Sequence, residues 1–220
     1  MPGRAALLLF FDIAPDAIAE HDDWHTHEHL PERLSIPGFL RGTRWEALRA
    51  GQPRYFVVYE VSDVEVLTSG PYLERLNHPT PWTSKMMPHY RGMTRGLCRV
   101  TGRAGLGSGG AALVARFRPA GDAAALRERM TKEVMSGLAS RPGLGACTLF
   151  ESAAAAPMTK EQSIRGKDAG IDWALVATGY EGEAVAGLER SGLGLPDDAV
   201  FGLYRMHYAL DELEAKDSAR

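Results

Sequence analysis

Histidines are concentrated in one short stretch near the start of the chain, at His21, His25, His27 and His29. At about 100° per residue of a helix, His25 and His29 share one face with Ile18. Imidazole titrates near neutral pH, which suits proton transfer, and an i, i+4 pair also has the spacing of metal ligands. We predict that His25 and His29 are an acid/base pair in a pocket. A satisfied core pair and a divalent metal site are the alternatives.

The neighbouring polar residues of this helix are expected to be less involved. A buried imidazole without a partner costs about 1 to 3 kcal/mol, so His25 and His29 need hydrogen bonds or a polar cavity. We expect His21 and His27 to be solvated or satisfied in the core, with His21 flanking the pocket entrance and His27 facing solvent. Glu28 is expected to be solvated, because its helical angle points away from His29.

The elements that must position these histidines occur twice along the chain. Ala5-Ala6-Leu7 recurs as Ala111-Ala112-Leu113, a shift of 106 residues, and Gly96-Leu97 recurs at the same shift as Gly202-Leu203. Two separate blocks with one offset indicate an internal duplication. The second copy has no histidine at the matching places, where mainly apolar residues stand, so the site is expected in the first copy only.

Each copy reads as strand, helix, strand, strand, helix, strand, which is the ferredoxin-like motif. We predict an α+β fold of two tandem ferredoxin-like βαββαβ repeats, residues 1–104 and 105–220, whose antiparallel sheets pack together within one chain. The glycine-rich residues 101–110 are expected to be a flexible linker. The expected strands are 5–13, 40–48, 54–61, 94–102, 111–118, 144–151, 172–180 and 199–208, and the expected helices are 17–34, 63–76, 122–139 and 182–191.

A second dense stretch, residues 69–83, has no equivalent in the second copy. Its prolines predict an extended loop after the helix, and Trp82 needs an apolar surface to pack on. We predict Tyr72, Asn77 and Trp82 as pocket walls opposite the histidine helix; the alternative is a rigid connection that plugs the end of the barrel. Residues 152–172 are longer than the matching turn, which suggests a lid, a binding loop or disorder.

Composition excludes several classes of function. The formal net charge is −3 and no Lys/Arg cluster alternates with aromatic residues, so neither nucleic acid nor a membrane is an expected partner. The apolar run 5–11 is interrupted by Asp12 and is too short to span a bilayer, and we expect a cytoplasmic protein. Cys98 and Cys147 are isolated and are predicted to be buried free thiols.

A longer motif surrounds the histidines. It consists of Trp24-His25, of Glu28-His29-Leu30-Pro31-Glu32-Arg33 with its His-x-Pro element, of Pro37-Gly38-Phe39 and of Arg44-Trp45. This motif resembles the dimeric α/β barrel superfamily, in particular its EthD-like and stress-responsive branches. The resemblance implies a barrel of two ferredoxin-like units with a pocket between sheet and helices. It also implies several activities: cofactor-independent monooxygenases, polyketide cyclases, decarboxylases, lactone isomerases and haem-handling enzymes.

Together these features favour a small enzyme without an organic cofactor that acts on a hydrophobic carbonyl-bearing or aromatic metabolite. His25 and His29 are the predicted catalytic residues, and Trp24, Tyr72, Asn77 and Trp82 the predicted substrate-binding residues. The alternatives are a binding protein for such a metabolite or for haem, a metal-dependent enzyme, and a structural dimer-forming protein. For haem, His89 and His207 stay open as ligands, and homodimerisation stays open as well.

Overall fold

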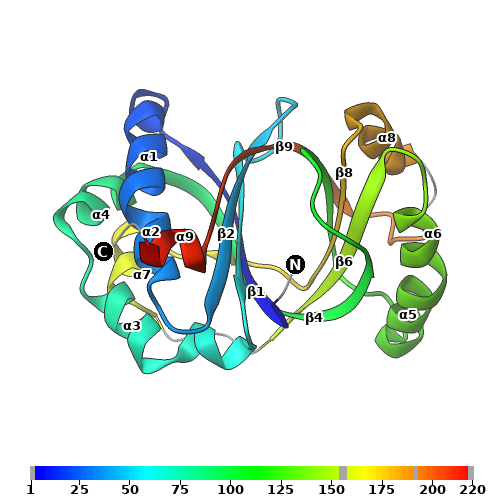
Figure 1. Cartoon of the computed structure of the whole chain (residues 1–220), viewed down its shortest axis with the longest axis horizontal. Helices are drawn as coiled ribbons and strands as arrows, with labels where there is room; N and C mark the ends of the chain where they lie inside the picture. The colour runs from blue at the N-terminus through cyan, green and yellow to red at the C-terminus, as the bar shows by residue number, and fades with distance from the viewer. Residues whose placement is uncertain (1–2, 154–157, 191–192, 218–220) are drawn as a thin grey trace.

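The strands of this protein form a closed antiparallel barrel with helices on two opposite sides (Figure 1). The computed structural model of the protein describes residues 3–153, 158–190 and 193–217. Eight strands follow one another around the barrel as β1, β3, β2, β9, β5, β8, β6 and β4, and β4 closes the ring on β1. Their bounds are β1 Ala5–Ile13, β2 Phe39–Ala47, β3 Tyr55–Val61, β4 Tyr90–Gly105, β5 Ala111–Phe117, β6 Leu144–Ser152, β8 Trp173–Gly179 and β9 Val200–Asp211.

The helices of the first half cover one side of the barrel, and most helices of the second half cover the other. On the first side lie η1 Pro15–Ala17, α1 Ile18–Trp24, η2 His25–His29, α2 Leu30–Leu34, η3 Val64–Thr68, α3 Gly70–Asn77, α4 Pro81–Met86 and η4 Met87–His89. The second half has α5 Ala123–Arg129, η5 Met130–Val134, α6 Met135–Ala139, α7 Lys160–Arg165, α8 Gly182–Gly187, η6 Leu188–Arg190 and α9 Glu212–Asp217. None of the helices in the described ranges has the length and apolar character needed to cross a membrane.

Strand β1 shows why this sequence forms a barrel with covered outer faces. Successive side chains of a strand point to opposite faces. Leu7 and Phe11 pack outward against the helices, whereas Leu8 and Phe10 pack into the barrel interior. Because both faces of β1 are buried, its sequence is a nearly continuous apolar run. A shift of its pairing register by one residue would exchange the side chains that face the helices with those that face the barrel interior.

Two long strands join the halves of the chain. The first part of β4 pairs with β1, and from Cys98 onward it pairs with β6. Strand β9 likewise pairs with β5 and then with β2. The expected linker 101–110 is therefore wrong in extent, because β4 continues to Gly105. A Cβ at Gly102 would lie 2.4 Å from Cγ2 of Thr131, so this glycine permits close packing of a helix on the strand.

The region after β3 departs from the predicted single helix and extended loop. The expected helix 63–76 is divided into η3 and α3, and residues 81–86 form α4 instead of continuing the loop. Thr80 accepts a hydrogen bond from the backbone N–H of Thr83, and Pro81 occupies the first turn, where its missing N–H has no cost. The prolines thus begin a helix here.

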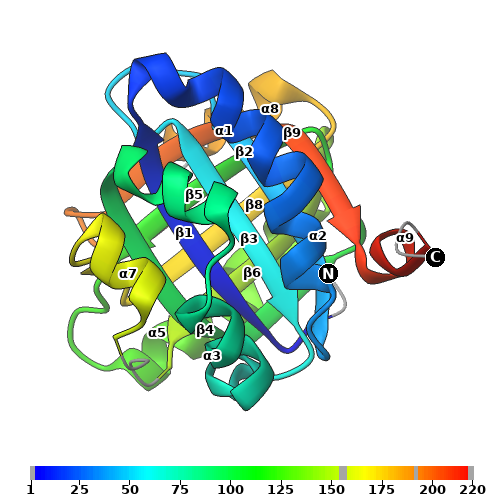
Figure 2. The ribbon, with the colours of Figure 1, turned by 90° about the vertical axis from the view of Figure 1, so that its left-hand side faces the viewer.

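The long connection between β6 and β8 includes an ordered helix that crosses to the first half. Residues 154–157 lie outside the described residues; α7 and the short strand β7 Ala169–Gly170 follow. Helix α7 contacts α3 and η4, and it lies on the same side of the barrel as α1 to α4 (Figure 2). The second half therefore contributes an element to the helical layer of the first.

Candidate functional site

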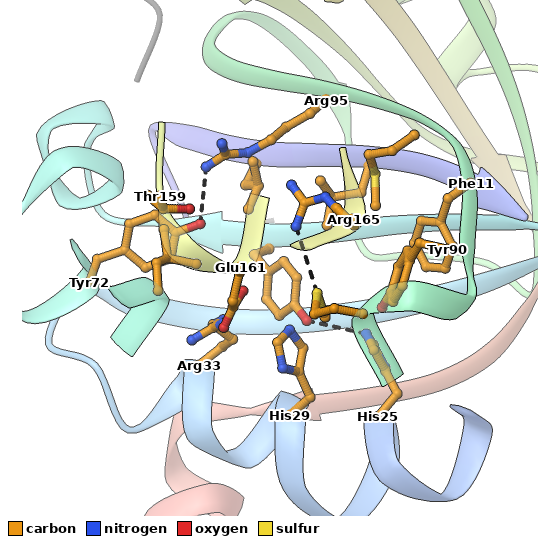
Figure 3. A pocket seen from close by; sticks show the side chains of 16 residues that line it. Phe11, His25, His29, Arg33, Tyr72, Tyr90, Arg95, Thr159, Glu161 and Arg165 are labelled. Carbon is orange, nitrogen blue, oxygen red and sulfur yellow. Dashed lines mark hydrogen bonds and ion pairs between the residues drawn. The ribbon is translucent and has the colours of Figure 1, made fainter. Parts of the chain in front are cut away.

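A small cavity lies between the outer face of the barrel and the helices of the first half (Figure 3). Strands β1, β3 and β4 form its floor, the helix with the histidines forms one wall, and α7 covers it. Its volume is about 30 Å³, which is room for one or two water molecules. The lining residues are Leu7, Leu9, Phe11, His25, His29, Arg33, Tyr59, Tyr72, Leu76, Met87, Tyr90, Met93, Arg95, Thr159, Glu161 and Arg165.

His25 and His29 both line this cavity from a π-helical turn within the long first helix. Their side chains are buried, with 1% and 7% exposure, and their ring centroids are 5.6 Å apart. The second half has a π turn at the matching place, Met130–Val134, without histidine. The distorted backbone is therefore common to both halves, and the imidazoles are what distinguishes the first.

The chemical state of these two rings follows from burial. His25 Nε2 lies 3.2 Å from the hydroxyl of Tyr59, while Nδ1 of each histidine has no hydrogen-bond partner in the described parts of the chain. Desolvation lowers the pKa of both rings well below the usual 6.5, and nearby cations such as Arg33 lower it further. Both imidazoles are therefore neutral at pH 7, the form that can accept a proton.

His21 is a satisfied core histidine and does not flank an entrance. Its ring is fully buried, with Nδ1 3.3 Å from Oδ1 of Asp22 and Nε2 3.4 Å from the hydroxyl of Tyr90. The hydroxyl of Tyr55 donates to the same oxygen of Asp22 at 2.8 Å. His27 is exposed, as expected, with Nδ1 3.0 Å from the backbone oxygen of Asp23.

Charged side chains that sequence reasoning missed make up much of the cavity wall. Arg33 and Glu161 are each 2% exposed, and they form a buried ion pair at 2.5 Å. Arg95 lies 3.4 Å from the hydroxyl of Tyr72, and Arg165 extends from α7 (Figure 3). Arg33 belongs to the Pro-Glu-Arg segment after the histidines, and its place four residues after His29 could have indicated that it lines the same cavity. No local pattern relates Arg95 on β4 or the α7 residues to the histidines.

Of the predicted substrate-binding residues, Tyr72 lines the cavity and Trp24 lies behind its wall. The Trp24 ring is fully buried with its centroid 4.4 Å from that of His29, and its indole N–H donates to Glu28 at 3.1 Å. Glu28 also accepts from the hydroxyl of Thr80 at 2.6 Å, so the expectation of a solvated Glu28 is wrong. The N-terminus of α4 approaches this carboxylate and supplies two further donors, the hydroxyls of Thr80 and Thr83.

Asn77 and Trp82 lie away from the cavity, contrary to the prediction. Asn77 is exposed, and its side-chain oxygen accepts a hydrogen bond from the backbone of Lys160 at 3.1 Å. Trp82 is half-buried and donates to Glu20 on α1 at 3.1 Å. Because α4 begins at Pro81, this segment turns toward α1. Through this hydrogen bond Asn77 joins the end of α3 to the start of α7, the helix that covers the cavity.

The histidines outside this helix do not extend the cavity. His207 lies on β9 and accepts a hydrogen bond from Nε of Arg44 at 3.2 Å, while His89 ends η4; neither lines the cavity. A haem is far larger than this cavity of about 30 Å³, so the residues that line the cavity do not fit one. Within the described ranges, no group of three or more His, Cys, Asp or Glu side chains is arranged to hold a metal ion.

The two cysteines, and Arg99 and Arg205 on strands β4 and β9, do not line the cavity. Cys98 and Cys147 are buried free thiols, as predicted, and burial raises the pKa of each to about 12. A thiol with so high a pKa is a poor nucleophile at neutral pH. Arg99 and Arg205 are exposed and form ion pairs with Glu65 and Glu46, respectively.

Comparison with solved structures identifies the fold. An anthrone oxidase-like protein matches with a TM-score of 0.68 and 12% identity, covering 96% of this chain and 94% of its own. A proposed monooxygenase from Fusobacterium nucleatum gives 0.61 and 9%, covering 96% and 98%. One from Lactobacillus acidophilus gives 0.57 and 11%, covering 94% and 96%. Neither protein-family models nor curated protein sequences give a match to this chain.

These likenesses confirm the predicted resemblance to the dimeric α/β barrel superfamily at the level of the fold. The α+β class is confirmed with it, because a closed antiparallel barrel with flanking helices is what the neighbours share. The EthD-like branch stays a prediction. At 9 to 12% identity, the neighbours do not transfer any residue's role to this chain.

Proposed function

We propose that this protein is an enzyme in which His29 and His25 move protons on an aromatic or carbonyl-bearing metabolite, without an organic cofactor. The observation that carries the proposal is the pair of buried, neutral imidazoles in the wall of one cavity. Neutral imidazole is the basic form, and burial next to cations keeps it available at neutral pH. The apolar part of the cavity wall, with Leu7, Phe11 and Met93, suits a hydrophobic part of a substrate.

The two histidines have different surroundings and therefore different proposed roles. The ring of His29 points into the cavity (Figure 3) and is proposed as the general base. His25 shares a hydrogen bond with Tyr59, a phenol whose pKa burial raises well above 10, so the hydroxyl stays protonated. The His25 and Tyr59 pair is proposed to donate a hydrogen bond to an oxygen on which negative charge develops.

Among reaction classes we favour oxygenation by dioxygen over cyclisation, isomerisation or decarboxylation. The support is that neighbours with this fold bear the names anthrone oxidase-like protein and monooxygenase. His29 would take a proton from an acidic CH2 group next to an aromatic ring, and the resulting carbanion would reduce dioxygen. The overall change is CH2 + O2 → C=O + H2O, in which carbon is oxidised and dioxygen is reduced to water.

We further propose that the chain is built from two tandem ferredoxin-like repeats, residues 1–104 and 105–220, of which only the first has the reactive histidines. The order of elements supports this, since the main elements of each half follow one another along the chain as strand, helix, strand, strand, helix and strand. The π turn at the same place in both halves is a second support. The site nevertheless draws α7 from the second half.

The test measures dioxygen consumption and product formation with a phenolic (hydroxylated) anthrone as the substrate probe. His29→Gln is expected to lower kcat by about 10²- to 10⁴-fold, the usual contribution of a general base. His25→Gln is expected to lower it less, because Tyr59 remains. His27→Gln, at an exposed position on the same helix, is the control and should leave turnover unchanged. Full activity in both His29→Gln and His25→Gln would refute the proposal.

A further inference from the structure

We propose that the cavity binds its ligand through an anionic oxygen group, a carboxylate or phenolate, held by Arg33 and Arg95. In the present structure the carboxylate of Glu161 occupies the place of that group. The inference rests on the proposed function only in using the same cavity, and it concerns binding rather than turnover.

The first observation is the buried ion pair between α2 and α7. Arg33 has almost no exposure, and Nη2 donates to Oε1 of Glu161 at 2.5 Å, across 128 residues of sequence. A buried guanidinium needs a carboxylate or equivalent acceptors, because an unpaired buried charge costs several kcal/mol. Glu32, the residue before Arg33, approaches the guanidinium at 3.4 Å but does not line the cavity. Of the two carboxylates that pair with Arg33, Glu161 is therefore the one that lies in the cavity wall.

The second observation is an excess of positive charge in the cavity wall. Arg33, Arg95 and Arg165 line the cavity, and Glu161 is the carboxylate that lines it with them. Arg165 is paired outside the cavity with Asp168, at 2.7 and 3.1 Å. Arg95 is half-buried, and within the described residues its hydrogen-bond partner is the phenol of Tyr72, not a carboxylate. Its positive charge thus remains available to an anionic ligand.

The third observation is the space. A cavity of about 30 Å³ holds one or two water molecules, so a ligand with an aromatic ring must displace protein atoms. Glu161 extends from a helix of six residues that covers the cavity. An anionic ligand that displaces Glu161 replaces the short ion pair of Arg33, whereas a neutral ligand that displaces it leaves the buried guanidinium with only the longer contact to Glu32, at 3.4 Å. This difference selects for anions.

The position of Arg33 connects this binding to the proposed chemistry. Arg33 follows His29 by four residues, so both side chains lie on one face of the helix and point into the cavity (Figure 3). A ligand anchored by its anionic group at Arg33 would have the adjacent part of its ring beside His29. The inferred substrate class is therefore an aromatic carboxylate or phenolate.

The test compares the binding of benzoate and of benzamide, a neutral probe of similar shape, to the full chain by calorimetry. Benzoate is expected to bind at least about tenfold more tightly, the range of one charge-assisted contact. Arg95→Gln should lower this preference several-fold, because Arg33 alone then holds the anionic group. Glu161→Gln should bind benzoate several-fold more tightly, because the competing carboxylate is gone. Glu128→Gln, in an exposed ion pair with Lys132, is the matched control and should change nothing.

Equal binding of the two probes, or no binding of benzoate, would overturn the inference. Unaltered benzoate affinity in a folded Glu161→Gln protein would overturn the displacement of Glu161. Circular dichroism checks folding; if that variant does not fold, the wild-type and Arg95→Gln comparison still decides whether the site selects anions. His29→Gln separates the two proposals, since it should keep the preference for benzoate. Normal turnover in that variant would refute the proposed base and leave the anion site intact.

Discussion

At the scale of single residues, the cavity histidines show how burial selects chemistry. His25 and His29 stand on the helix face that packs against the barrel, where desolvation and the charge of Arg33 favour the neutral ring. A solvated histidine would be partly protonated just below neutral pH. Burial therefore gives a base that stays unprotonated in mildly acidic conditions, and the same effect makes the fold sensitive to acid.

We expect the stability of the folded protein to fall as the pH drops below 6.5. Both rings have a folded-state pKa well below the usual 6.5, so between these values the unfolded chain binds protons that the folded chain does not. Stability then decreases as pH falls, by up to about 1.4 kcal/mol per pH unit for each ring, and it does not depend on these rings above pH 7. Urea unfolding at pH 7.5 and 5.5 measures the difference.

The control for this pH dependence is a variant that lacks one buried ring. His25→Gln should unfold with a smaller difference in free energy between the two pH values, whereas His27→Gln, which is exposed, should behave as the wild type. An equal pH dependence in His25→Gln and wild type would contradict the assignment of the effect to His25.

At the scale of elements, α4 links the second motif to the histidine helix through one residue. Thr80 accepts from the N–H of Thr83 at 2.9 Å and donates to Glu28 at 2.6 Å, so one side chain both begins α4 and pairs the carboxylate beside the cavity wall. In the segment where we predicted Asn77 and Trp82 as pocket walls, it is thus Thr80 that contacts the histidine helix, and its role is structural.

Thr80→Ala is expected to destabilise the protein by about 1 to 3 kcal/mol, because it removes a helix cap and leaves Glu28 with fewer donors. Thr80→Ser keeps the hydroxyl and should retain most of the stability. The midpoint and slope of urea unfolding measure both variants. If alanine and serine at this position gave the same stability, the hydroxyl would not have the role that the two hydrogen bonds indicate.

The sequence predicted elements well where periodicity and end signals are local. The expected strands 40–48, 54–61 and 144–151 correspond closely to β2, β3 and β6. It failed where local signals have two meanings: the prolines around Thr80 begin a helix, and the glycines of β4 permit close packing. His25 and His29 were identified as cavity residues because the second half lacks them. Glu161 could not be found, because only the tertiary path of α7 brings it to Arg33.

At the scale of the whole molecule, barrel closure makes the two halves interdependent. The pairs β2 with β9 and β4 with β6 cross from one half to the other. The barrel interior mixes side chains of both, such as Phe10 and Phe56 with Val114 and Phe150. Either half alone would expose this apolar face and two unpaired strand edges, which is unfavourable in water. We therefore do not expect the two halves, which share one order of elements along the chain, to be separate folding units.

We therefore expect the full chain to unfold in one cooperative transition. In a Trp173→Phe protein, fluorescence reports on Trp24, Trp45 and Trp82, all in the first half, while far-UV circular dichroism reports on both halves. Because the strand pairs and the barrel interior join the halves, the two signals should give coincident urea curves.

Insertion of Gly-Ser after Gly107, in the short connection between β4 and β5, is the control. It should shift the midpoint only slightly, because loop-closure entropy grows slowly with length. Separated transitions would show that the halves are stable on their own, and that the cover which α7 gives the cavity is an interdomain contact.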